Sequence, residues 1–582
     1  MRLWRPRFLK KWVFAVIECA DSEDYIDLLL SDSTATDFLS NSFRRQLSMD
    51  VIKDFLSPDT ISTLFLIQAV NGKNISESIA LDHAGALHVV HLAEVDDDSD
   101  TQLPSAMAAV YVTPKSSNEG AFGAGLKERN RIIYTTNFTA DTRYPALLLN
   151  ETFVKNLSDW GFNFARVGMM WSGVEPSPNQ YDENYLNIMK QIVDLLQKYG
   201  IYVLLDMHQD ILLSRLGTYD GIPPWLYDRF PPPKHSYPWP LKPNSTTGSN
   251  WSLGYITEAT NHAFQCLYDN VGGAVDSFKN FWHLVASTFG SYETVIGYEF
   301  INEPWAGNIF QNPALLLPGE AGTLNLQPLY DKLSTAIRSV DNDTLIFYEP
   351  VTWGVRLNGK YFGTGFSHVP GGAQYQNRSV LSYHYYCIIL RLVPVPGNES
   401  IPVFDRTLCD DIEGPAMFRS VQVDLNLLGG SSFLTEFGGC DNTPTCVEQV
   451  RYGLEKTDQF WQSWAYWGHL ILNYTTGTID LPNIKIFSRP YARAVAGIPL
   501  SLQFNAQRLT FYFAYTIDPS IGQPTEIYVP PLSYSNGFNV TVSNGLIWSV
   551  DSKNKNIILV YHSTKLFSRH ENIIGIVEIN PA

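Results

Sequence analysis

Short apolar runs that end in polar residues recur along the middle of the chain, separated by stretches of helix length. The clearest run, residues 295–301, ends at Asn302-Glu303-Pro304. So short a run of β-branched and aromatic residues favours a buried strand of a parallel sheet, which the proline then ends. Residues 185–200 instead repeat apolar side chains at helical spacing and finish at a glycine. That stretch is therefore expected to be a helix.

Seven such strands are predicted, with helical segments between them. They cover residues 162–168, 201–210, 295–304, 344–350, 380–386, 431–438 and 464–467. Alternating strands and helices indicate an α/β fold with a parallel sheet, and this number fits a (β/α)8 TIM barrel. Residues 87–92 and 132–137 are both candidates for the missing first strand.

The pattern changes near residue 490, where short strand-like runs alternate with Pro, Asn and Gly turns. The runs lie at residues 510–515, 525–529, 538–542 and 556–561. This spacing is typical of a β-sandwich. We therefore expect an N-terminal region of unclear structure at 1–110, a catalytic barrel at 111–489 and a C-terminal β-sandwich at 490–582.

Composition narrows the class of protein. Hydrophobic residues make up 45% of the chain and charged residues 17%, which fits a globular protein. A formal net charge of −17 argues against a nucleic-acid partner and is compatible with an acidic compartment. The aromatic content of 13% suits sugar and lipid contacts, or simply a large core. The apolar run at 61–70 is too short to span a bilayer, so no transmembrane helix is expected.

Glycosylation sequons and cysteines favour a secreted or lysosomal protein. Basic residues precede the apolar run 12–17 in the charge order of a signal peptide, although Glu18 cuts that run short. Cys387 with Cys409 and Cys440 with Cys446 are plausible disulfides. Eleven Asn-X-Ser/Thr sequons occur, at Asn74, Asn137, Asn150, Asn156, Asn244, Asn250, Asn342, Asn377, Asn398, Asn473 and Asn539.

Two predicted strands end in a carboxylate, Glu303 in one and Glu436 in the other. A single glutamate at a strand end is usually just a solvated side chain. A pair at the carboxyl ends of barrel strands is what a retaining glycosidase requires, namely an acid/base and a nucleophile about 5 Å apart.

The two motifs that carry these glutamates resemble glycoside hydrolase family five. They are Asn302-Glu303-Pro304 and Thr435-Glu436-Phe437-Gly438, and the longer string 301–307 is similar to the endoglycoceramidase branch. The resemblance implies a barrel with a C-terminal β-sandwich, retaining chemistry, and neither cofactor nor metal. It also implies that the substrate is a glycosphingolipid, cleaved between oligosaccharide and ceramide.

The same resemblance assigns roles to residues at the strand ends. Glu303 would be the acid/base and Glu436 the nucleophile, with Arg166 supporting its charge or forming only a structural ion pair. The implied substrate-binding residues are Asn302, Asp206, His208, Asp210, His384, Tyr386 and Trp467. Asn302 is alternatively a turn cap, His384 and Trp467 are alternatively core residues, and Trp464 is a substitute for Trp467.

Substrate choice depends on less specific features. The apolar loop 313–319 follows the acid/base strand, and it would either seat an alkyl chain or tuck under the neighbouring domain. Contact with a membrane surface or micelle is compatible with a lipid substrate. The alternatives are a related glycosidase acting on β-glucan or on simple galactosyl- or glucosylceramide, and a non-catalytic glycolipid-binding protein, which would not need both glutamates.

Overall fold

The computed structural model describes residues 151–582, apart from short gaps, and five short strands within the first 150 residues. The gaps lie at 217–220, 245, 247, 352–354, 358–359, 387–389, 394–400, 405, 439–443, 468–470, 472–478 and 563–572. The candidate strand at 132–137 lies outside the described residues.

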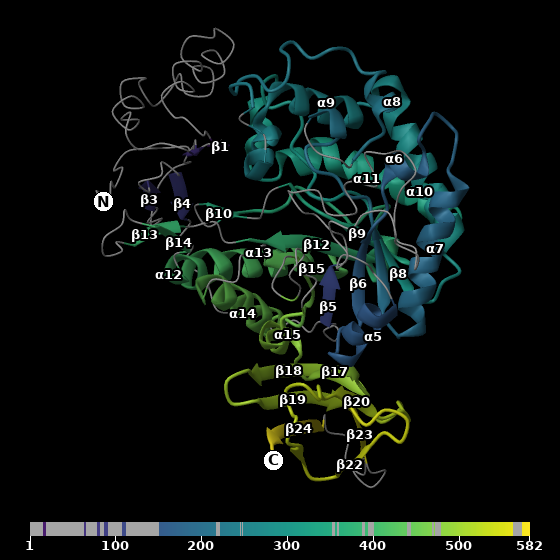
Figure 1. Ribbon diagram of the computed structural model, residues 1–582, viewed down its shortest axis with the longest axis vertical. Coiled ribbons are helices and arrows are strands. Elements are labelled where there is room, and N and C mark those ends of the chain that lie inside the picture. Colours follow the sequence, from purple (N-terminus) through teal and green to yellow (C-terminus); the bar gives the residue numbers. More distant parts are fainter. Residues whose placement is uncertain are drawn as a thin grey trace.

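Eight parallel strands form a closed barrel, in the order β12-β15-β16-β5-β6-β7-β8-β9 (Figure 1). Their bounds are Ala108–Tyr111 for β5, Phe164–Gly168 for β6, Tyr202–Asp206 for β7, Val295–Glu299 for β8, Leu345–Tyr348 for β9, Ser379–Tyr385 for β12, Ser431–Gly438 for β15 and Ser463–Trp467 for β16. All seven predicted strands are therefore confirmed.

The first barrel strand is β5, which pairs with β16 on one side and β6 on the other. The interpretation of residues 87–92 as this strand is wrong. Leu87–Val90 forms β4, which pairs antiparallel with β3 (Ser78–Leu81) in a separate two-stranded sheet. Short apolar runs of this kind do not reveal their pairing partner, because that choice depends on the rest of the sheet.

Helices surround the barrel and connect its strands (Figure 1). They are α5 (Glu151–Asp159), α6 (Trp171–Val174), α7 (Glu183–Lys198), α8 (Pro224–Tyr227), α9 (Glu258–Tyr268), α10 (Ala274–Phe289), α11 (Gln327–Arg338), α12 (Arg406–Leu408), α13 (Gly414–Leu428), α14 (Pro444–Gln459) and α15 (Leu481–Phe487). Within the described residues, no helix is long and apolar enough to cross a membrane.

Local sequence explains where α7 begins and ends. The Asp182 side chain accepts a hydrogen bond from the backbone N–H of Tyr185 over 3.0 Å, which caps the helix. Beyond its end, Gly200 adopts a φ of +69°, which a glycine takes readily. The predicted apolar face is buried, at Leu186, Met189, Ile192, Val193 and Leu196.

The barrel interior is filled by apolar side chains from six strands. The rings of Phe164 and Phe433 lie 4.7 Å apart, and Phe347 packs against Phe433 at 5.6 Å. The complete buried set is Phe164, Leu204, Phe347, Val380, Phe433 and Ala465. This packed layer closes the barrel, so chemistry is confined to its ends.

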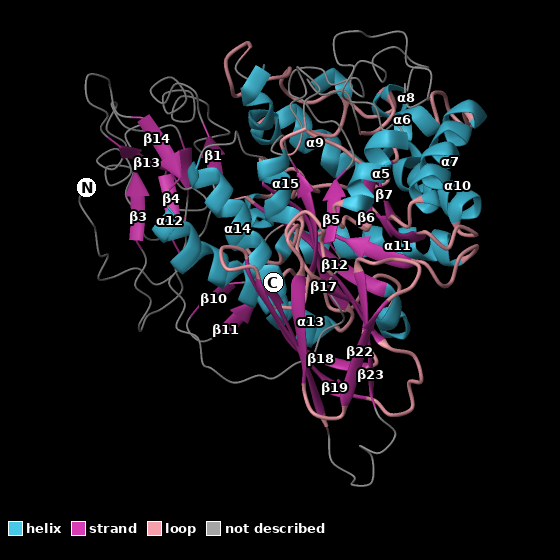
Figure 2. Cartoon of the chain, turned by 60° about the horizontal axis from the view of Figure 1, so that its bottom comes forward, coloured by secondary structure: helices cyan, strands magenta, loops and turns pink. Residues whose placement is uncertain are grey.

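The C-terminal unit is a β-sandwich of two four-stranded antiparallel sheets, as predicted (Figure 2). One sheet has the order β17-β20-β23-β22 and the other β18-β19-β24-β21. Their bounds are β17 Tyr491–Ala494, β18 Gly497–Asn505, β19 Thr510–Ile517, β20 Thr525–Tyr528, β21 Phe538–Val542, β22 Leu546–Val550, β23 Ile557–His562 and β24 Ile574–Pro581.

The sandwich packs against the amino-terminal end of the barrel, next to α5 and α15 (Figure 1). The hydroxyl of Tyr528 donates to the carbonyl of Asp159 over 3.2 Å, and Ser488 donates to the carbonyl of Trp160 over 2.7 Å. Asp159 ends α5 and Trp160 follows it, so both lie before β6 begins. The opposite, carboxyl end of the barrel is therefore left free for a site.

Four short strands make up two further small sheets: β10 (Val355–Leu357) pairs with β11 (Lys360–Phe362), and β13 (Leu390–Val393) with β14 (Ile401–Phe404). In the N-terminal part, β1 (Val16–Glu18) pairs with β2 (Thr63–Phe65). Cys409 and Cys446 are disulfide-bonded. Their predicted partners, Cys387 and Cys440, lie outside the described residues, so the pairing remains a prediction.

Candidate active site

An ionic layer lies directly above the apolar layer inside the barrel, because side chains two residues apart on a strand point to the same face. Phe164 of the apolar layer is followed by Arg166, and Leu204 by Asp206. Likewise Phe347 is followed two residues later by Glu349. Glu299, His384, Glu436 and Trp467 occupy the corresponding ends of the other strands. The strand register thus gathers residues that lie far apart in sequence.

Arg166 occupies the centre of this layer and is fully buried. Its Nη1 lies 2.6 Å from Oε1 of Glu436, and its Nε forms an ion pair with Glu299. Nη2 donates to Oδ1 of Asn302 over 2.8 Å and lies 3.1 Å from Oδ1 of Asp206. The predicted contact with Glu436 is therefore present. The ion-pair alternative is also correct, since one guanidinium serves both purposes.

Glu436 is held by two donors in a buried position, with only 4% of its side chain exposed. Besides Arg166, the hydroxyl of Tyr386 donates to Oε2 of Glu436 over 2.8 Å. Burial, together with the negative charges of Glu436 and Glu303, raises the pKa of Tyr386 well above its usual value. Tyr386 thus remains a hydroxyl donor, and its bond and that of Arg166 fix both oxygens of Glu436 in place.

Glu303 lies in a strained turn after β8. Its φ of +39° falls in the left-handed region, which is unusual for a residue with a side chain. Nε2 of Gln209 donates to the carbonyls of both Asn302 and Glu303, over 2.5 and 2.8 Å. The side chain of Glu303 is 32% exposed, against 4% for that of Glu436. The turn therefore presents the carboxyl of Glu303 at the mouth of the site.

Glu303 and Glu436 face each other across the opening. One oxygen of each carboxylate and one ring nitrogen of His384 lie within 4.8 Å of one another. In retaining glycosidases the two carboxyl groups are about 5 Å apart, because one attacks the sugar while the other protonates the leaving oxygen. This spacing is too short for the inverting mechanism, which places a water molecule between carboxylate and sugar.

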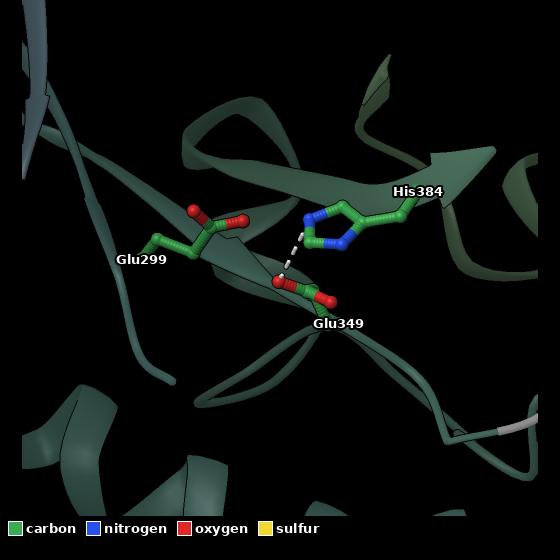
Figure 3. Close-up of side chains that lie close together, drawn as sticks. All are labelled: Glu299, Glu349 and His384. Atoms are coloured by element: carbon green, nitrogen blue, oxygen red, sulfur yellow. Dashed lines mark ion pairs between the residues drawn. The ribbon is translucent and has the colours of Figure 1, made fainter. Parts of the chain in front are cut away.

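His384 connects the two carboxylates to a third. Its Nδ1 lies 2.8 Å from Oε1 of Glu303 and 3.4 Å from Oε2 of Glu436. Its Nε2 lies 3.4 Å from Oε1 of Glu349 (Figure 3). Burial lowers the pKa of His384, but the charges of Glu349, Glu436 and Glu303 outweigh burial and raise this pKa to about 10.

The predicted sugar-binding cluster is brought together at the end of β7. His208 Nδ1 lies 2.7 Å from Oδ2 of Asp206, and its Nε2 lies 3.9 Å from Oδ2 of Asp210. The rings of His208 and Trp467 stack at 5.5 Å with an angle of 3° between their planes. Trp464 instead packs in the core against Phe437 and other rings, which leaves Trp467 as the tryptophan of the site.

Asn302 is both a sugar-ligand candidate and a structural residue. It is fully buried, accepts from Arg166, and donates through Nδ2 to the carbonyl of Gln209 over 3.0 Å. An amide Nδ2 carries two hydrogens, so a bond to a sugar hydroxyl would use the second. The bond from Nδ2 to the carbonyl of Gln209 is the contact that fits the turn-cap alternative.

Sequence reasoning missed Glu299, Glu349, Gln209 and Tyr255. The first two are signalled by the period-two pattern, since each follows an inward-facing strand residue by two positions. Glu349 also precedes a proline, as Glu303 does. Tyr255, whose hydroxyl lies 3.5 Å from the carbonyl of Glu303, lies in a 3-10 helix, η3 (Gly248–Ile256), which has no such pattern. No local signal in that helix points to the site.

Two residue groups in the described part of the chain have the spacing of metal ligands, Glu299–Glu349–His384 and Glu303–His384–Glu436. The guanidinium of Arg166 already contacts Glu299, Glu349 and Glu436. Positive charge is thus supplied to both groups by an arginine, and the donor set fits an ion-pair network better than a cation site.

A barrel with two close carboxylates at the carboxyl ends of its strands is the architecture of a retaining glycoside hydrolase. The family model described as cellulase (glycosyl hydrolase family 5) matches residues 133–469. The model of the glycoside hydrolase family 5 C-terminal domain matches residues 489–573. The chain belongs to glycoside hydrolase family 5, and endoglycoceramidases are among its relatives.

The endoglycoceramidase of Hydra vulgaris is 36% identical over 432 residues, which cover 70% of this chain and 76% of that protein. That of Cyanea nozakii is 35% identical and covers 75% of this chain and 88% of the relative. The structure of endo-glycoceramidase II from Rhodococcus sp. in complex with ganglioside GM3 superposes with a TM-score of 0.61, at 22% identity. It covers 82% of this chain and 97% of that chain, and confirms the fold.

Proposed function

We propose that this protein is an endoglycoceramidase, which hydrolyses the β-linkage between the oligosaccharide and the ceramide of glycosphingolipids with retention of configuration. The observation that carries the proposal is the facing pair Glu303 and Glu436, with oxygens within 4.8 Å, in a chain 35% and 36% identical to two endoglycoceramidases. Activity is expected to peak at acidic pH, because one carboxyl must be protonated while the other is ionised.

Glu436 serves as the nucleophile in this proposal. Its burial and its bonds from Arg166 and Tyr386 hold a carboxylate in one orientation. Glu436 attacks the anomeric carbon as the bond from that carbon to the ceramide oxygen breaks. A glycosyl ester forms, and the electron pair of the broken bond stays on the ceramide oxygen.

Glu303 serves as the acid and then as the base. It gives its proton to the ceramide oxygen in the first step, so that ceramide leaves as an alcohol. In the second step it takes a proton from water, whose oxygen attacks the anomeric carbon and releases Glu436. Its exposure of 32% suits this role, because leaving group and water must both reach it. Two inversions at one carbon restore the β configuration.

The ceramide is expected to leave over the loop that follows Glu303. Ile309 and Leu315 are buried in an apolar cluster, against which Trp305, Phe310 and Leu316 pack partly exposed. Trp239 extends this surface, with its ring 5.5 Å from that of Phe310. The loop packs within the carboxyl end of the barrel, while the sandwich lies at the other end. These contacts favour the lipid-seat interpretation, at about 0.8 kcal/mol per buried methylene.

A secreted or lysosomal location and contact with a lipid surface are parts of the same proposal. The eleven sequons and the disulfide-bonded Cys409 and Cys446 support an oxidising, secretory route. Glycosphingolipids reside in membranes or micelles, so the substrate has to be met at such a surface.

The test is incubation of the purified protein with ganglioside GM1, with glucosylceramide and with a soluble β-glucan. An endoglycoceramidase releases intact oligosaccharide and ceramide from the ganglioside, which mass spectrometry and thin-layer chromatography detect. Glu303→Gln and Glu436→Gln serve as inactive controls. Cleavage of the glucan alone, or of glucosylceramide alone, would replace the proposal by one of its enzymatic alternatives. Binding to the ganglioside without turnover would make the protein a glycolipid-binding module.

A further inference from the structure

Glu349 contacts the acid/base residue Glu303 through one carboxyl oxygen and faces His384 with the other. It follows directly after β9, and only 4% of its side chain is exposed. Oε2 accepts the backbone N–H of Glu303 over 3.2 Å, and Oε1 lies 3.4 Å from Nε2 of His384. The carbonyl of Glu349 in turn accepts the hydroxyl of Tyr330 over 2.8 Å. This bond fixes the backbone of Glu349, and thereby the position from which its side chain extends.

The bond to the N–H of Glu303 matters because that backbone is strained. A φ of +39° costs a non-glycine residue on the order of 1 kcal/mol, so the turn persists only where its surroundings hold it. Gln209 holds the carbonyl groups of this turn, and Glu349 holds its N–H. Together they set the direction in which the carboxyl of Glu303 points.

The second contact makes Glu349 and His384 a dyad. His384 lies between the carboxylates of Glu349 and Glu303. Its Nε2 faces Glu349, as Figure 3 shows, and its Nδ1 faces Glu303. Burial, together with Glu299 and Glu303, raises the pKa of Glu349 well above its usual value, while His384 and Arg166 oppose the rise. Oε1 of Glu349 and Nε2 of His384 face each other at 3.4 Å without a hydrogen bond between them. One proton placed on either group leaves the dyad neutral, with a hydrogen on Nδ1 that faces Glu303.

The charged environment of the dyad explains why its neutrality matters. Arg166 is a permanent cation 3.6 Å from Glu349, and it also pairs with Asp206 on β7. The other groups that face the dyad or Glu303 are Glu299 on β8, Glu436 on β15, and the hydroxyls of Tyr255 and Tyr386. An unpaired imidazolium at 2.8 Å would favour the ionised form of Glu303 and remove the proton that the first step needs.

We propose that Glu349 is a positioning residue for the acid/base carboxyl: it fixes the strained turn at Glu303 and shares one proton with His384. When Glu303 has given its proton to the leaving oxygen, the shared proton moves to Nε2 and stabilises the new carboxylate. When Glu303 takes a proton from water, the shared proton returns to Oε1. No proton enters or leaves the dyad. The proposal rests on the acid/base role of Glu303 given above.

Two variants separate the effect of the charge of Glu349 from the effect of its side-chain length. Glu349→Gln keeps the shape and an oxygen for the N–H of Glu303, but it removes the negative charge. With its oxygen on that N–H, the amide NH2 faces Nε2 of His384 and donates to it, so His384 stays neutral and cannot stabilise a carboxylate at Glu303. Glu349→Asp keeps the charge but is one methylene too short to hold the N–H of Glu303.

The measurement is the pH profile of kcat/KM on phenyl β-lactoside, whose leaving group needs a proton but which carries no ceramide. Glu349→Gln should move the alkaline limb to higher pH by about one unit, because the carboxylate of Glu303 loses the imidazolium that stabilises it in the wild type. Glu349→Asp should keep the limb in place and lower kcat at every pH. Hydrolysis of this substrate by the wild type without cleavage of ganglioside would refute the proposed lipid specificity and leave the test of Glu349 intact.

Asp424→Asn is the matched control, because Asp424 is another buried carboxyl and lies on α13 outside the site. It should leave the pH profile unchanged, and the melting temperatures of all variants report on folding. The proposal is overturned if Glu349→Gln keeps the wild-type limb, whether kcat is retained or lost. Loss of kcat without a shifted limb would mean that Glu349 only supports the structure.

Discussion

Arg166 and Glu436 are joined by a contact of 2.6 Å between Nη1 and Oε1, with both side chains almost completely buried. The same guanidinium contacts Glu299, Asn302 and Asp206. One cation therefore organises both the nucleophile and the turn that carries the acid/base. Removing one member of such a buried network costs about 3–5 kcal/mol, since the remaining charges are left without a partner.

Glu436→Gly should abolish hydrolysis, because it removes the group that attacks the sugar while Arg166 and Tyr386 remain. The substitution opens space on that face of the sugar, so added azide is expected to take the place of the carboxylate. The product should be the glycosyl azide of inverted configuration, which NMR identifies through its anomeric coupling. Near-normal activity without azide would show that Glu436 is not the nucleophile.

Glu303→Ala should slow cleavage of ceramide-linked substrates by about 10²–10⁴-fold, because an alkoxide leaves poorly without a proton. An aryl glycoside with a good leaving group should lose much less in the first step. Azide then attacks the glycosyl-enzyme from the opposite face, and the azide product should retain its configuration. The same anomer from both glutamate variants would contradict the assignment of roles.

Asp424 should make the protein more stable in acid than at neutral pH. Burial raises the pKa of Asp424 to about 6, against the opposing hydrogen bonds from Tyr361 and Thr364. The folded state thus keeps a proton that the unfolded chain releases from about pH 4 upward. This contribution, on the order of 3 kcal/mol, is fully present below pH 4 and is lost as the pH rises through 6.

Asp424→Asn is neutral at every pH and should remove that dependence. Its melting temperature should match that of the wild type near pH 4 and exceed it near pH 7, as differential scanning fluorimetry would show. An identical fall in melting temperature for both proteins would assign the pH dependence to other groups, among them Glu413, whose pKa burial raises to about 7.

Gly161 should be essential for docking of the sandwich. It adopts a φ of +95°, and a Cβ there would lie 2.4 Å from the ring of Tyr528. Gly161→Ala therefore adds a clash at the domain contact to the backbone strain. Gly200 has a φ of +69° and nothing within 4 Å of an added Cβ, so Gly200→Ala carries the strain alone, roughly 1 kcal/mol. Equal melting temperatures for the two variants would show that the contact contributes nothing.

The sequence by itself determined the strand-and-helix series, the sandwich, and the residues Glu303 and Glu436 with most of their companions. These features are local. Burial of one face makes apolar residues recur at a regular spacing along each helix or strand, and Asn302-Glu303-Pro304 marks the end of a strand regardless of its neighbours. The face of α7 and the four predicted sandwich strands were readable for the same reason.

Only the tertiary structure decided which segments meet. β5 closes the barrel and residues 87–90 do not, because pairing is settled by neighbours far away in sequence. The contacts of Arg166 with Glu299, and of Glu349 with Glu303 and His384, depend on the register of parallel strands around the closed barrel. The sequence shows which polar residue ends each strand. The distances between these residues, and therefore the ion pairs and proton transfers among them, are set only when the barrel closes.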